Sequence, residues 1–374
     1  MKRVFAVCGT RPDAIKMAPV ILELRAHGDL DTRVIASGQH REMLRQVFDT
    51  FEIREDRNFD VMRERQTLAY ITSSVLSALD EAIEAESPDL VIAQGDTTTT
   101  LVAGMAAFYR RIPFAHVEAG LRTDTIESPF PEEFNRRAVS QVTRLHFAPT
   151  AAAKENLVAE RVKSDWVLVT GNTSIDAILD MSRRLEPLNP PRDGRMILVT
   201  THRRENWGEP QTRICRAIVR ILDAVEDAYV YLPMHPNKVV REVLELELGK
   251  NERVILTEPP EYRSFAQLMM ASHLILTDSG GVQEEAPSLG KPVLVLRDET
   301  ERPEGIDAGN AVLVGTNEEK IYGEAVRLLT DADAYDRMAQ ARNPYGDGLA
   351  AKRIVAAVRR HLGLPYEEVG EFQS

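Results

Sequence analysis

The sequence has only two cysteines and no long hydrophobic run, and these absences exclude several classes of protein. Cys8 and Cys215 lie far apart, and no CxxC or Cys/His spacing indicates a zinc site or a disulfide framework. No apolar stretch reaches the roughly 18 residues of a membrane-spanning helix. The apolar run within residues 1–7 is too short for a signal peptide. We therefore expect a cytoplasmic protein without a membrane span.

Three common motifs of nucleotide-binding proteins and hydrolases are also missing. There is no GxGxxG after a strand, no GxxxxGK[ST] and no GxSxG. Their absence argues against a tightly bound dinucleotide, P-loop chemistry and a serine nucleophile of the hydrolase type. His202 and Glu205 have an HxxE spacing, but further metal ligands are lacking nearby. We expect no metal site.

The sequence has fewer basic than acidic residues, 46 Lys and Arg against 58 Asp and Glu. The formal net charge is -12, with 28% charged residues, so the protein has little long-range attraction for nucleic acid or anionic membranes. We expect neither as a partner. An anionic substrate would need local cations, which the sequence does group together: Arg11 with Lys16, Arg136 with Arg137, His202 with Arg203 and Arg204, and Arg302.

The alternation of short apolar runs with amphipathic stretches predicts an α/β fold with parallel sheets covered by helices. The 374 residues, 43% of them hydrophobic, exceed the usual size of one core. Prolines and a glycine within 183–195 indicate a linker. We predict two doubly wound Rossmann-like domains, 1–182 and 196–349. The expected strands are 3–7, 33–36, 90–93, 114–117, 145–147, 167–169, 196–200, 229–232, 254–256, 274–276, 293–296 and 311–314.

The segment TDSGGVQEE, residues 277–285, carries the most information. It follows an expected strand and opens an expected helix, and its glycines, Gly280 and Gly281, allow a ligand to approach the backbone closely. Free N–H groups at a helix start favour an anion such as phosphate. Glu284 and Glu285, one turn on, suit a hydroxyl-bearing group. The combination predicts a site for a sugar nucleotide.

Several acids of the first half follow expected strands or open helices. Asp96 suits acid–base chemistry or a helix N-cap about equally. Glu118 ends an apolar strand before a glycine and is expected to face a cleft. Glu132 and Glu133 follow a proline-rich turn, where either could instead favour the helix start electrostatically. Acids from separate loops that converge at the carboxyl ends of parallel strands would form a catalytic site.

Cations and histidines supply the remaining candidates. Arg11 and Lys16 flank the start of an expected helix and suit an anion, with a solvated surface pair as the alternative. His202 suits a phosphate contact or a proton shuttle. His235 could bind a ligand or cap a turn.

Taken together, the motifs resemble those of the non-hydrolysing UDP-N-acetylglucosamine 2-epimerases. One difference is Asp13, where that family commonly has glutamate. The matching segments run in order from Gly9 to Thr316: GTRPDAIKMAPV, SGQHREML, QGDTTTT, HVEAGLRT, PFPEEFNRR, GNTSIDA, VTTHRREN, LTDSGGVQEEAPSLGKPVLVLRDETERPE and GNAVLVGT.

The resemblance implies a fold of the GT-B type with the active site in a cleft between two domains. It implies a homodimer and a C-terminal segment, about 350–374, that returns to the first domain. The implied reaction interconverts UDP-GlcNAc and UDP-ManNAc by anti elimination of UDP to a 2-acetamidoglucal and its re-addition, without a cofactor. The product would feed the synthesis of a cell-surface polysaccharide.

The resemblance also implies roles for individual residues. Asp96, Glu118, Glu132 and His202 would be catalytic. The substrate would be bound by Arg11, Lys16, Phe265, Ser279, Gly280, Gly281, Glu285 and Arg302, with Phe265 against uracil and Glu285 on the ribose. Members of the family are often activated by UDP-GlcNAc at a second site, which would involve Gln39, Arg65 and His235 here.

Three other functions remain open at this point. A hydrolysing epimerase would share the elimination step and release ManNAc. A GT-B glycosyltransferase would pass the sugar to an acceptor. A non-catalytic sensor of sugar nucleotides would gain nothing from several acids beside a diphosphate.

Overall fold

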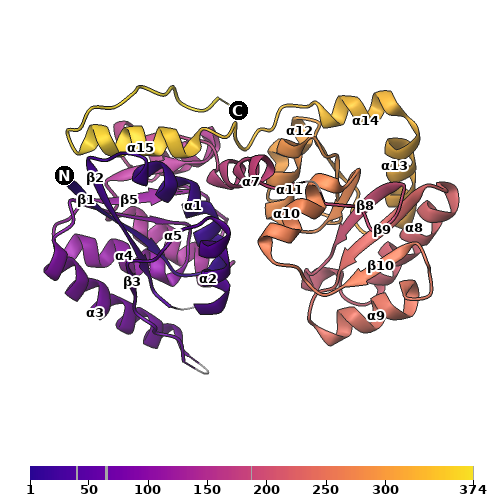
Figure 1. The fold of residues 1–374 in the computed structure, drawn as a ribbon, viewed down its shortest axis with the longest axis horizontal. Coiled ribbons are helices and arrows are strands. Elements are labelled where there is room, and N and C mark those ends of the chain that lie inside the picture. Colours follow the sequence, from indigo (N-terminus) through magenta and orange to yellow (C-terminus); the bar gives the residue numbers. More distant parts are fainter. Residues whose placement is uncertain (39–40, 64–65, 187, 374) are drawn as a thin grey trace. The chain divides into compact units, whose positions relative to one another are not determined.

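The structure is a computed structural model that describes residues 1–38, 41–63, 66–186 and 188–373, apart from the side chain of Arg41. These residues form two compact units (Figure 1). Unit 1 comprises Met1–Ala177 and Gly346–Ser374, and unit 2 comprises Ile178–Tyr345. The chain therefore leaves unit 1 within helix α7 (Thr173–Arg184) and returns to it at Gly346.

The described strands of unit 1 form one sheet in the order β3-β2-β1-β4-β5-β6-β7, in which all neighbours are parallel. The central strands are buried on both faces, which explains why they read as continuous apolar runs. The strands are β1 (Lys2–Cys8), β2 (Leu30–Ala36), β3 (Arg57–Asn58), β4 (Leu90–Gln94), β5 (Phe114–Val117), β6 (Leu145–Ala148) and β7 (Val167–Val169).

Helices cover the faces of this sheet, and one of them comes from the far end of the sequence (Figure 1). Helix α15 (Ala350–His361) packs beside α1 (Arg11–Arg25), and Arg359 forms an ion pair with Asp29 at 2.5 Å. The other helices are α2 (Arg41–Thr50), α3 (Leu68–Glu86), α4 (Thr98–Tyr109), α5 (Glu132–Ser140), α6 (Ala151–Ala159), η1 (Ser164–Trp166) and the start of α7.

Unit 2 repeats this architecture with a parallel sheet in the order β10-β9-β8-β11-β12-β13 among the described residues. Its strands are β8 (Arg195–Thr200), β9 (Ala228–Pro233), β10 (Val254–Thr257), β11 (Leu274–Thr277), β12 (Val293–Val295) and β13 (Ala311–Leu313). Its helices are η2 (Arg204–Asn206), α8 (Glu209–Ala224), α9 (Lys238–Leu248), α10 (Tyr262–Ala271), α11 (Gly280–Glu285), η3 (Ala286–Leu289), α12 (Pro303–Asp307), α13 (Glu318–Thr330) and α14 (Ala332–Ala339).

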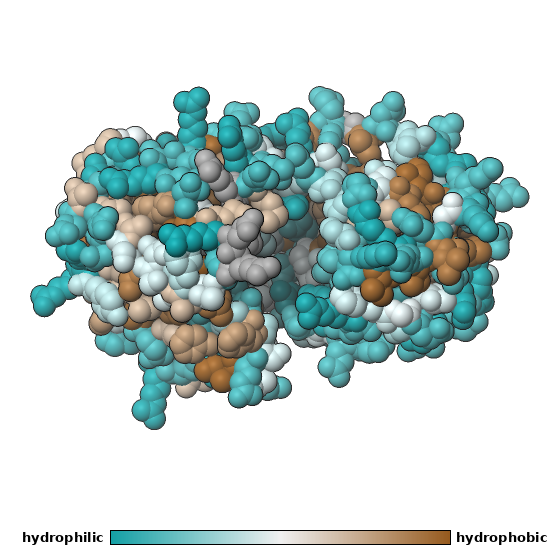
Figure 2. Space-filling model, turned by 90° about the horizontal axis from the view of Figure 1, so that it is seen from below, coloured by the Kyte–Doolittle hydropathy of each residue, from teal (hydrophilic) through white to brown (hydrophobic). Residues whose placement is uncertain are grey.

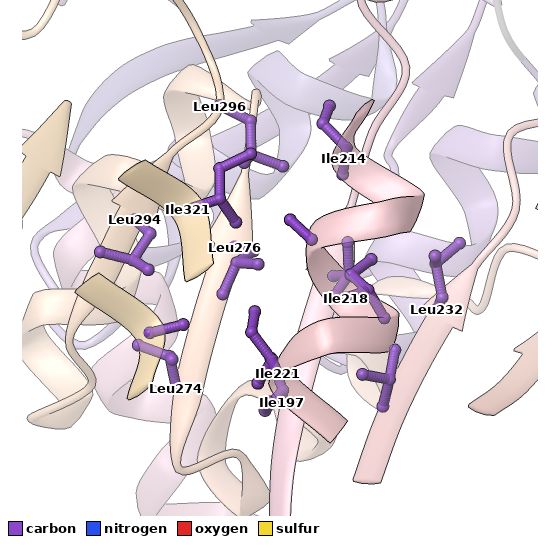
Figure 3. Packing of buried hydrophobic residues seen from close by; sticks show 14 of the residues in the cluster. Ile197, Ile214, Ile218, Ile221, Leu232, Leu274, Leu276, Leu294, Leu296 and Ile321 are labelled. Atoms are coloured by element: carbon purple, nitrogen blue, oxygen red, sulfur yellow. The ribbon is translucent and has the colours of Figure 1, made fainter. Parts of the chain in front are cut away.

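Helix α8 shows how the sequence builds the core of unit 2. Ile214, Ile218 and Ile221 recur at helical spacing and are almost completely buried. Figure 3 shows these side chains against residues of the neighbouring strands, among them Leu276 of β11 and Leu232 of β9. The apolar face of the helix thus covers one face of the parallel sheet.

The prediction of two parallel, Rossmann-like α/β sheets of the GT-B type is confirmed, and all twelve expected strands are strands. The sequence did not predict β3 (Arg57–Asn58), because its two residues are exposed and carry no apolar run. Within the described residues, none of the helices combines the length and apolar character needed to cross a bilayer. Figure 2 shows a mainly hydrophilic surface with hydrophobic spots on the visible face.

The strand orders place the functional loops. In unit 1 the order reverses between β1 and β4, and in unit 2 between β8 and β11. Ligands of open α/β sheets bind outside the carboxyl ends of the strands at such switch points. The segments after these four strands are 9–12, 95–100, 201–206 and 278–281, and all belong to motifs that the sequence indicated.

Candidate active site

Glu118 is the most strongly held acid of unit 1. It directly follows β5 and has a positive φ of 64°, which is uncommon for a residue other than glycine and occurs often at functional sites. Its carboxylate accepts hydrogen bonds from Lys16 Nζ at 2.5 Å, Asn172 Nδ2 at 3.2 Å and Gln94 Nε2. Three donors from three different segments therefore fix the position of one carboxylate.

Asp96 lies on the neighbouring loop, after β4. Its main-chain oxygen accepts a hydrogen bond from Asn135 Nδ2 at 2.8 Å, and its carboxylate lies 3.6 Å from Arg136 Nε. Burial raises the pKa of Asp96 above its usual range, although Arg136 and Lys16 act against this, and the negative charge of Glu132 raises the pKa further. Asp96 and Glu132 therefore interact electrostatically, and Asp96 holds a proton more readily than a free aspartate.

The two adjacent glutamates of α5 differ in their surroundings. Glu133 is completely buried and forms ion pairs with Arg136 at 3.2 Å and Arg137 at 2.7 Å. Its neighbour Glu132 is partly exposed at the first position of the helix. Glu133 therefore holds Arg136 and Arg137 in place, whereas Glu132 remains accessible near Asp96.

The loop after β1 orders the N-terminus of helix α1, where an anion could bind. Asp13 accepts hydrogen bonds from the main-chain N–H groups of Gly9 at 3.0 Å and Thr10 at 2.6 Å, which closes a capping box. Burial raises the pKa of Asp13 to about 6, although these hydrogen bonds act against it. Arg11 is partly exposed and forms no ion pair within the described part of the chain, so its charge is available to a ligand.

A buried histidine supports the turn that carries Asp96. His116 Nε2 lies 2.7 Å from the main-chain oxygen of Gly95, a residue with a φ of 79°. Burial lowers the pKa of His116 to about 4, so the ring is neutral near neutral pH and Nε2 can donate. His116 thereby links the end of β5 to the turn after β4.

In unit 2, an acid and a histidine meet at the switch point. Asp278, after β11, is completely buried, and its Oδ1 lies 2.8 Å from Nδ1 of His202. Its Oδ2 accepts hydrogen bonds from the main-chain N–H groups of His202 and Arg203 and from Asn206. Burial alone would raise the pKa of Asp278, but the contacts with His202 and the backbone donors outweigh it, and the pKa lies below its usual range.

The glycine turn after β11 leaves its backbone open. A Cβ atom added to Gly281 would meet no atom within 4 Å, and one added to Gly280 would meet only the guanidinium of Arg302, at 3.8 Å and beyond. The N–H group of Ser279 already donates to Thr277 Oγ1 at 3.0 Å, so only the hydroxyl of Ser279 could serve a phosphate. The following amides of α11 are the better candidates for an anion.

The remaining predicted substrate contacts also lie in unit 2. Phe265 is partly exposed on α10, and Glu285 is nearly buried on α11. The guanidinium of Arg302 donates to Glu284, so that arginine is held in place by an acid of the same motif.

The predicted second site can be described only in part. Gln39 and Arg65 lie outside the described residues. His235 follows β9 and stacks near His202, with ring centroids 6.3 Å apart and an angle of 28° between the rings. Its Nδ1 accepts a hydrogen bond from the N–H of Asn237 at 3.2 Å.

Comparisons with known proteins show the family to which the chain belongs. The family model described as UDP-N-acetylglucosamine 2-epimerase matches residues 22–359. The chain belongs to the UDP-N-acetylglucosamine 2-epimerase family. It is 52% identical over 373 residues to the UDP-N-acetylglucosamine 2-epimerase of Bacillus subtilis, covering 99% of this chain and 98% of that one. With the enzyme of that name from Escherichia coli it shares 46% identity over 371 residues, covering 96% and 99%.

Solved structures of the family share the fold. The crystal structure of UDP-GlcNAc 2-epimerase from Neisseria meningitidis, bound to UDP-GlcNAc, has a TM-score of 0.86 and 46% sequence identity to this chain, covering 96% of this chain and all of that one. Similarity over nearly the whole length of both chains means that both units belong to the epimerase family fold.

Some residues of this epimerase-family site were not found from the sequence. Gln94 and Asn172 are neutral amides, 24 and 54 residues from the carboxylate that they contact, and nothing in their motifs marks them as its donors. Asp278 stood in the recognised TDSGG motif, yet its partner His202 lies 76 residues away. The shared position at the carboxyl ends of neighbouring strands was the available signal for that pair.

Proposed function

We propose that the chain interconverts UDP-GlcNAc and UDP-ManNAc as a non-hydrolysing 2-epimerase. The observation that carries the proposal is the pair of acids after β4 and β5, of which Glu118 is held by three donors and Asp96 has a raised pKa. Two carboxyl groups in different environments suit the removal of a proton from one face of a carbon and its delivery to the other. Membership of the family supports the substrate.

The proposed reaction is an elimination followed by its reverse. A carboxylate removes the proton on carbon 2 of the sugar, the electron pair forms the double bond between carbons 1 and 2, and UDP leaves from the opposite face with the electrons of the carbon–oxygen bond. The resulting 2-acetamidoglucal stays bound. A proton then returns to carbon 2 on the other face, and UDP adds back to carbon 1. Atoms and charge balance without a redox cofactor.

We assign the acid–base steps to Asp96, Glu118 and Glu132 of unit 1. Arg11 and Lys16 supply positive charge that stabilises the negative charge developing on the diphosphate as the bond breaks. Lys16 also forms the ion pair with Glu118.

We assign the binding of UDP to unit 2. The open backbone at Gly280 and Gly281, with the hydroxyl of Ser279, receives phosphate, and His202 meets the leaving oxygen. Three further residues complete the set, with Phe265 for uracil, Glu285 for the ribose hydroxyls and Arg302 for the sugar or phosphate. Glu285 and Arg302 lie within a motif that the chain shares with the family, which supports their roles.

Incubation with UDP-GlcNAc in deuterium oxide tests the mechanism. Elimination and re-addition should place deuterium at carbon 2 of both recovered sugar nucleotides, as read by mass spectrometry and NMR. Hydrogen retained at carbon 2 during interconversion would refute the mechanism. Free ManNAc in the mixture would instead identify a hydrolysing epimerase, and transfer to an acceptor without exchange would identify a glycosyltransferase. We further propose that the product supplies cell-surface polysaccharide synthesis.

We propose that the protein is a homodimer, in keeping with the resemblance. Phe108 and Tyr109, at the end of α4, are 58% and 62% exposed beside a hollow of about 770 Å³ that Ile112 and Val142 also line. This apolar surface of unit 1 suits a second copy of the chain. Light scattering should give twice the mass of one chain, and Phe108→Glu should shift it toward one; a monomeric wild-type protein would refute the proposal.

We propose that UDP-GlcNAc activates the enzyme at a second site that includes His235, with Gln39 and Arg65. The stacking of His235 beside His202 supports a link to the proposed UDP site. The forward reaction should then be sigmoidal in UDP-GlcNAc, and pure UDP-ManNAc should not react until UDP-GlcNAc is added. Ready conversion of UDP-ManNAc alone would remove this proposal and leave the epimerase activity standing.

A further inference from the structure

Asp278 organises the loop that carries His202. The side chain is completely buried at the end of β11. Its Oδ2 accepts three hydrogen bonds, from the N–H groups of His202 and Arg203, both at 2.9 Å, and from Asn206 Nδ2 at 3.0 Å. Asn206 also donates to the main-chain oxygen of Leu296 at 3.0 Å. One carboxylate oxygen is thus fully engaged in holding the loop after β8 against β11.

The other oxygen faces the imidazole ring. Oδ1 of Asp278 lies 2.8 Å from Nδ1 of His202, whose side chain is 40% exposed. The pKa of Asp278 is lowered, and an ionised carboxylate can only accept, so a proton on the ring nitrogen that faces it stabilises this contact. Nε2 is then the nitrogen that can exchange a proton with a ligand.

We propose that Asp278 is a positioning residue that fixes His202 in the tautomer protonated at Nδ1 and leaves Nε2 to meet the substrate. The inference rests on the proposed function, in which His202 meets the leaving oxygen of UDP. Nε2 can carry a proton to that oxygen and receive it back in the reverse reaction, while Nδ1 keeps its own proton. A carboxylate that orients a catalytic histidine in this way acts through the ring and does not touch the substrate.

The variant Asp278→Asn distinguishes control of the His202 tautomer from the structural role of Asp278 in holding the loop after β8. The amide oxygen of asparagine can still accept the three hydrogen bonds that Oδ2 receives. The amide nitrogen then faces His202 Nδ1 and requires an acceptor there, which forces the proton of the neutral ring onto Nε2. The substitution should therefore reverse the tautomer and preserve the loop.

Nitrogen-15 NMR of selectively labelled histidine reads the tautomer directly, and His202→Gln assigns the signal. At about pH 9, above the ordinary titration range of histidine, the wild-type ring should be protonated at Nδ1, and Asp278→Asn should move the proton to Nε2. Asn206→Ala is the matched control, because it removes a hydrogen bond to Oδ2 and leaves Oδ1 in place; its His202 should keep the wild-type tautomer. A wild-type ring protonated at Nε2, or an unchanged ring in Asp278→Asn, would overturn the proposal.

Kinetics supply the second readout. Asp278→Asn should lower kcat about 100-fold or more, because the ring can no longer accept a proton at Nε2, and KM should stay within about threefold. A rise in KM with unchanged kcat would show that Asp278 serves only the binding loop. If the wild-type protein does not epimerise UDP-GlcNAc at all, the proposed function fails, whereas the tautomer measurement still decides the role of Asp278.

Discussion

Replacing Glu118 by glutamine keeps the volume of the side chain and removes its charge. The carboxylate is only 8% exposed, and within the described residues its hydrogen bonds come from Lys16 Nζ, Asn172 Nδ2 and Gln94 Nε2. The new amide nitrogen would therefore face a donor. Lys16 cannot become an acceptor, but Gln94 can turn its amide over and present an oxygen. The substitution is thus compatible with the fold.

Both effects have an expected size. Exchanging a charge-assisted contact for a neutral one should lower the free energy of unfolding by about 1.5–3 kcal/mol. The loss of a carboxylate that takes part in proton transfer should lower kcat by about 100-fold or more. The affinity for UDP should not fall, because most UDP contacts are assigned to unit 2 and the substitution keeps the positive charges of Arg11 and Lys16 in unit 1.

The assays are denaturation by urea, calorimetric titration with UDP, and conversion of UDP-GlcNAc followed by NMR. The double variant Glu118→Gln with Gln94→Glu is the informative control, because it again pairs a carboxylate with an amide at this site. It should recover most of the stability and none of the turnover. Turnover of Glu118→Gln within about threefold of wild type, or recovery of turnover in the double variant, would refute a direct role of Glu118.

Three further predictions concern stability. Asp176 accepts a hydrogen bond from the N–H of Ala350, and burial raises the pKa of Asp176 from 3.8 to about 6. Its contribution to the free energy of unfolding is therefore full below about pH 4 and falls by about 3 kcal/mol as the pH rises through 6. Denaturation across this range should show Asp176→Asn gaining stability relative to wild type, and a constant difference would contradict the reasoning. Gly120 has a φ of 92°, and an added Cβ would lie 2.1 Å from the oxygen of Ala153; Gly120→Ala should cost about 3 kcal/mol or more, and an unchanged melting temperature would show that the loop yields. Ile218→Ala should cost about 2–5 kcal/mol through the cavity left under α8, as measured in urea, whereas a cost below about 1 kcal/mol would show that the core closes over it.

Apolar runs made the sheets predictable from the sequence. Strands buried on both faces, such as β1 and β4, need continuous apolar residues, so they are visible without any knowledge of their neighbours. The positions of Asp96 and Glu118 followed from the same logic, since each comes just after such a strand. Strand β3, short and exposed, carries no such signal.

Contacts between distant segments set the limit of prediction. Asn172 reaches Glu118 only because β5 and β7 end at the same edge of the parallel sheet, so that the residues following them lie close together. An asparagine in a loop has many ordinary uses, and its sequence neighbours do not reveal which acid it will contact. The same holds for the contact between Asp278 and His202, which depends on β8 and β11 being neighbours.

Unit 1 is built from two separate segments of the chain, and this affects the order in which the two units can fold during synthesis. Residues of unit 2 are continuous in the sequence, from Ile178 to Tyr345, so a nascent chain can complete this unit while it is still on the ribosome. Unit 1 must wait for α15, because that helix packs beside α1 and Arg359 pairs with Asp29, 330 residues away. The first half of the chain to be synthesised is therefore the last to finish folding, and chains cut short before α15 would carry a finished unit 2 beside an uncovered α1.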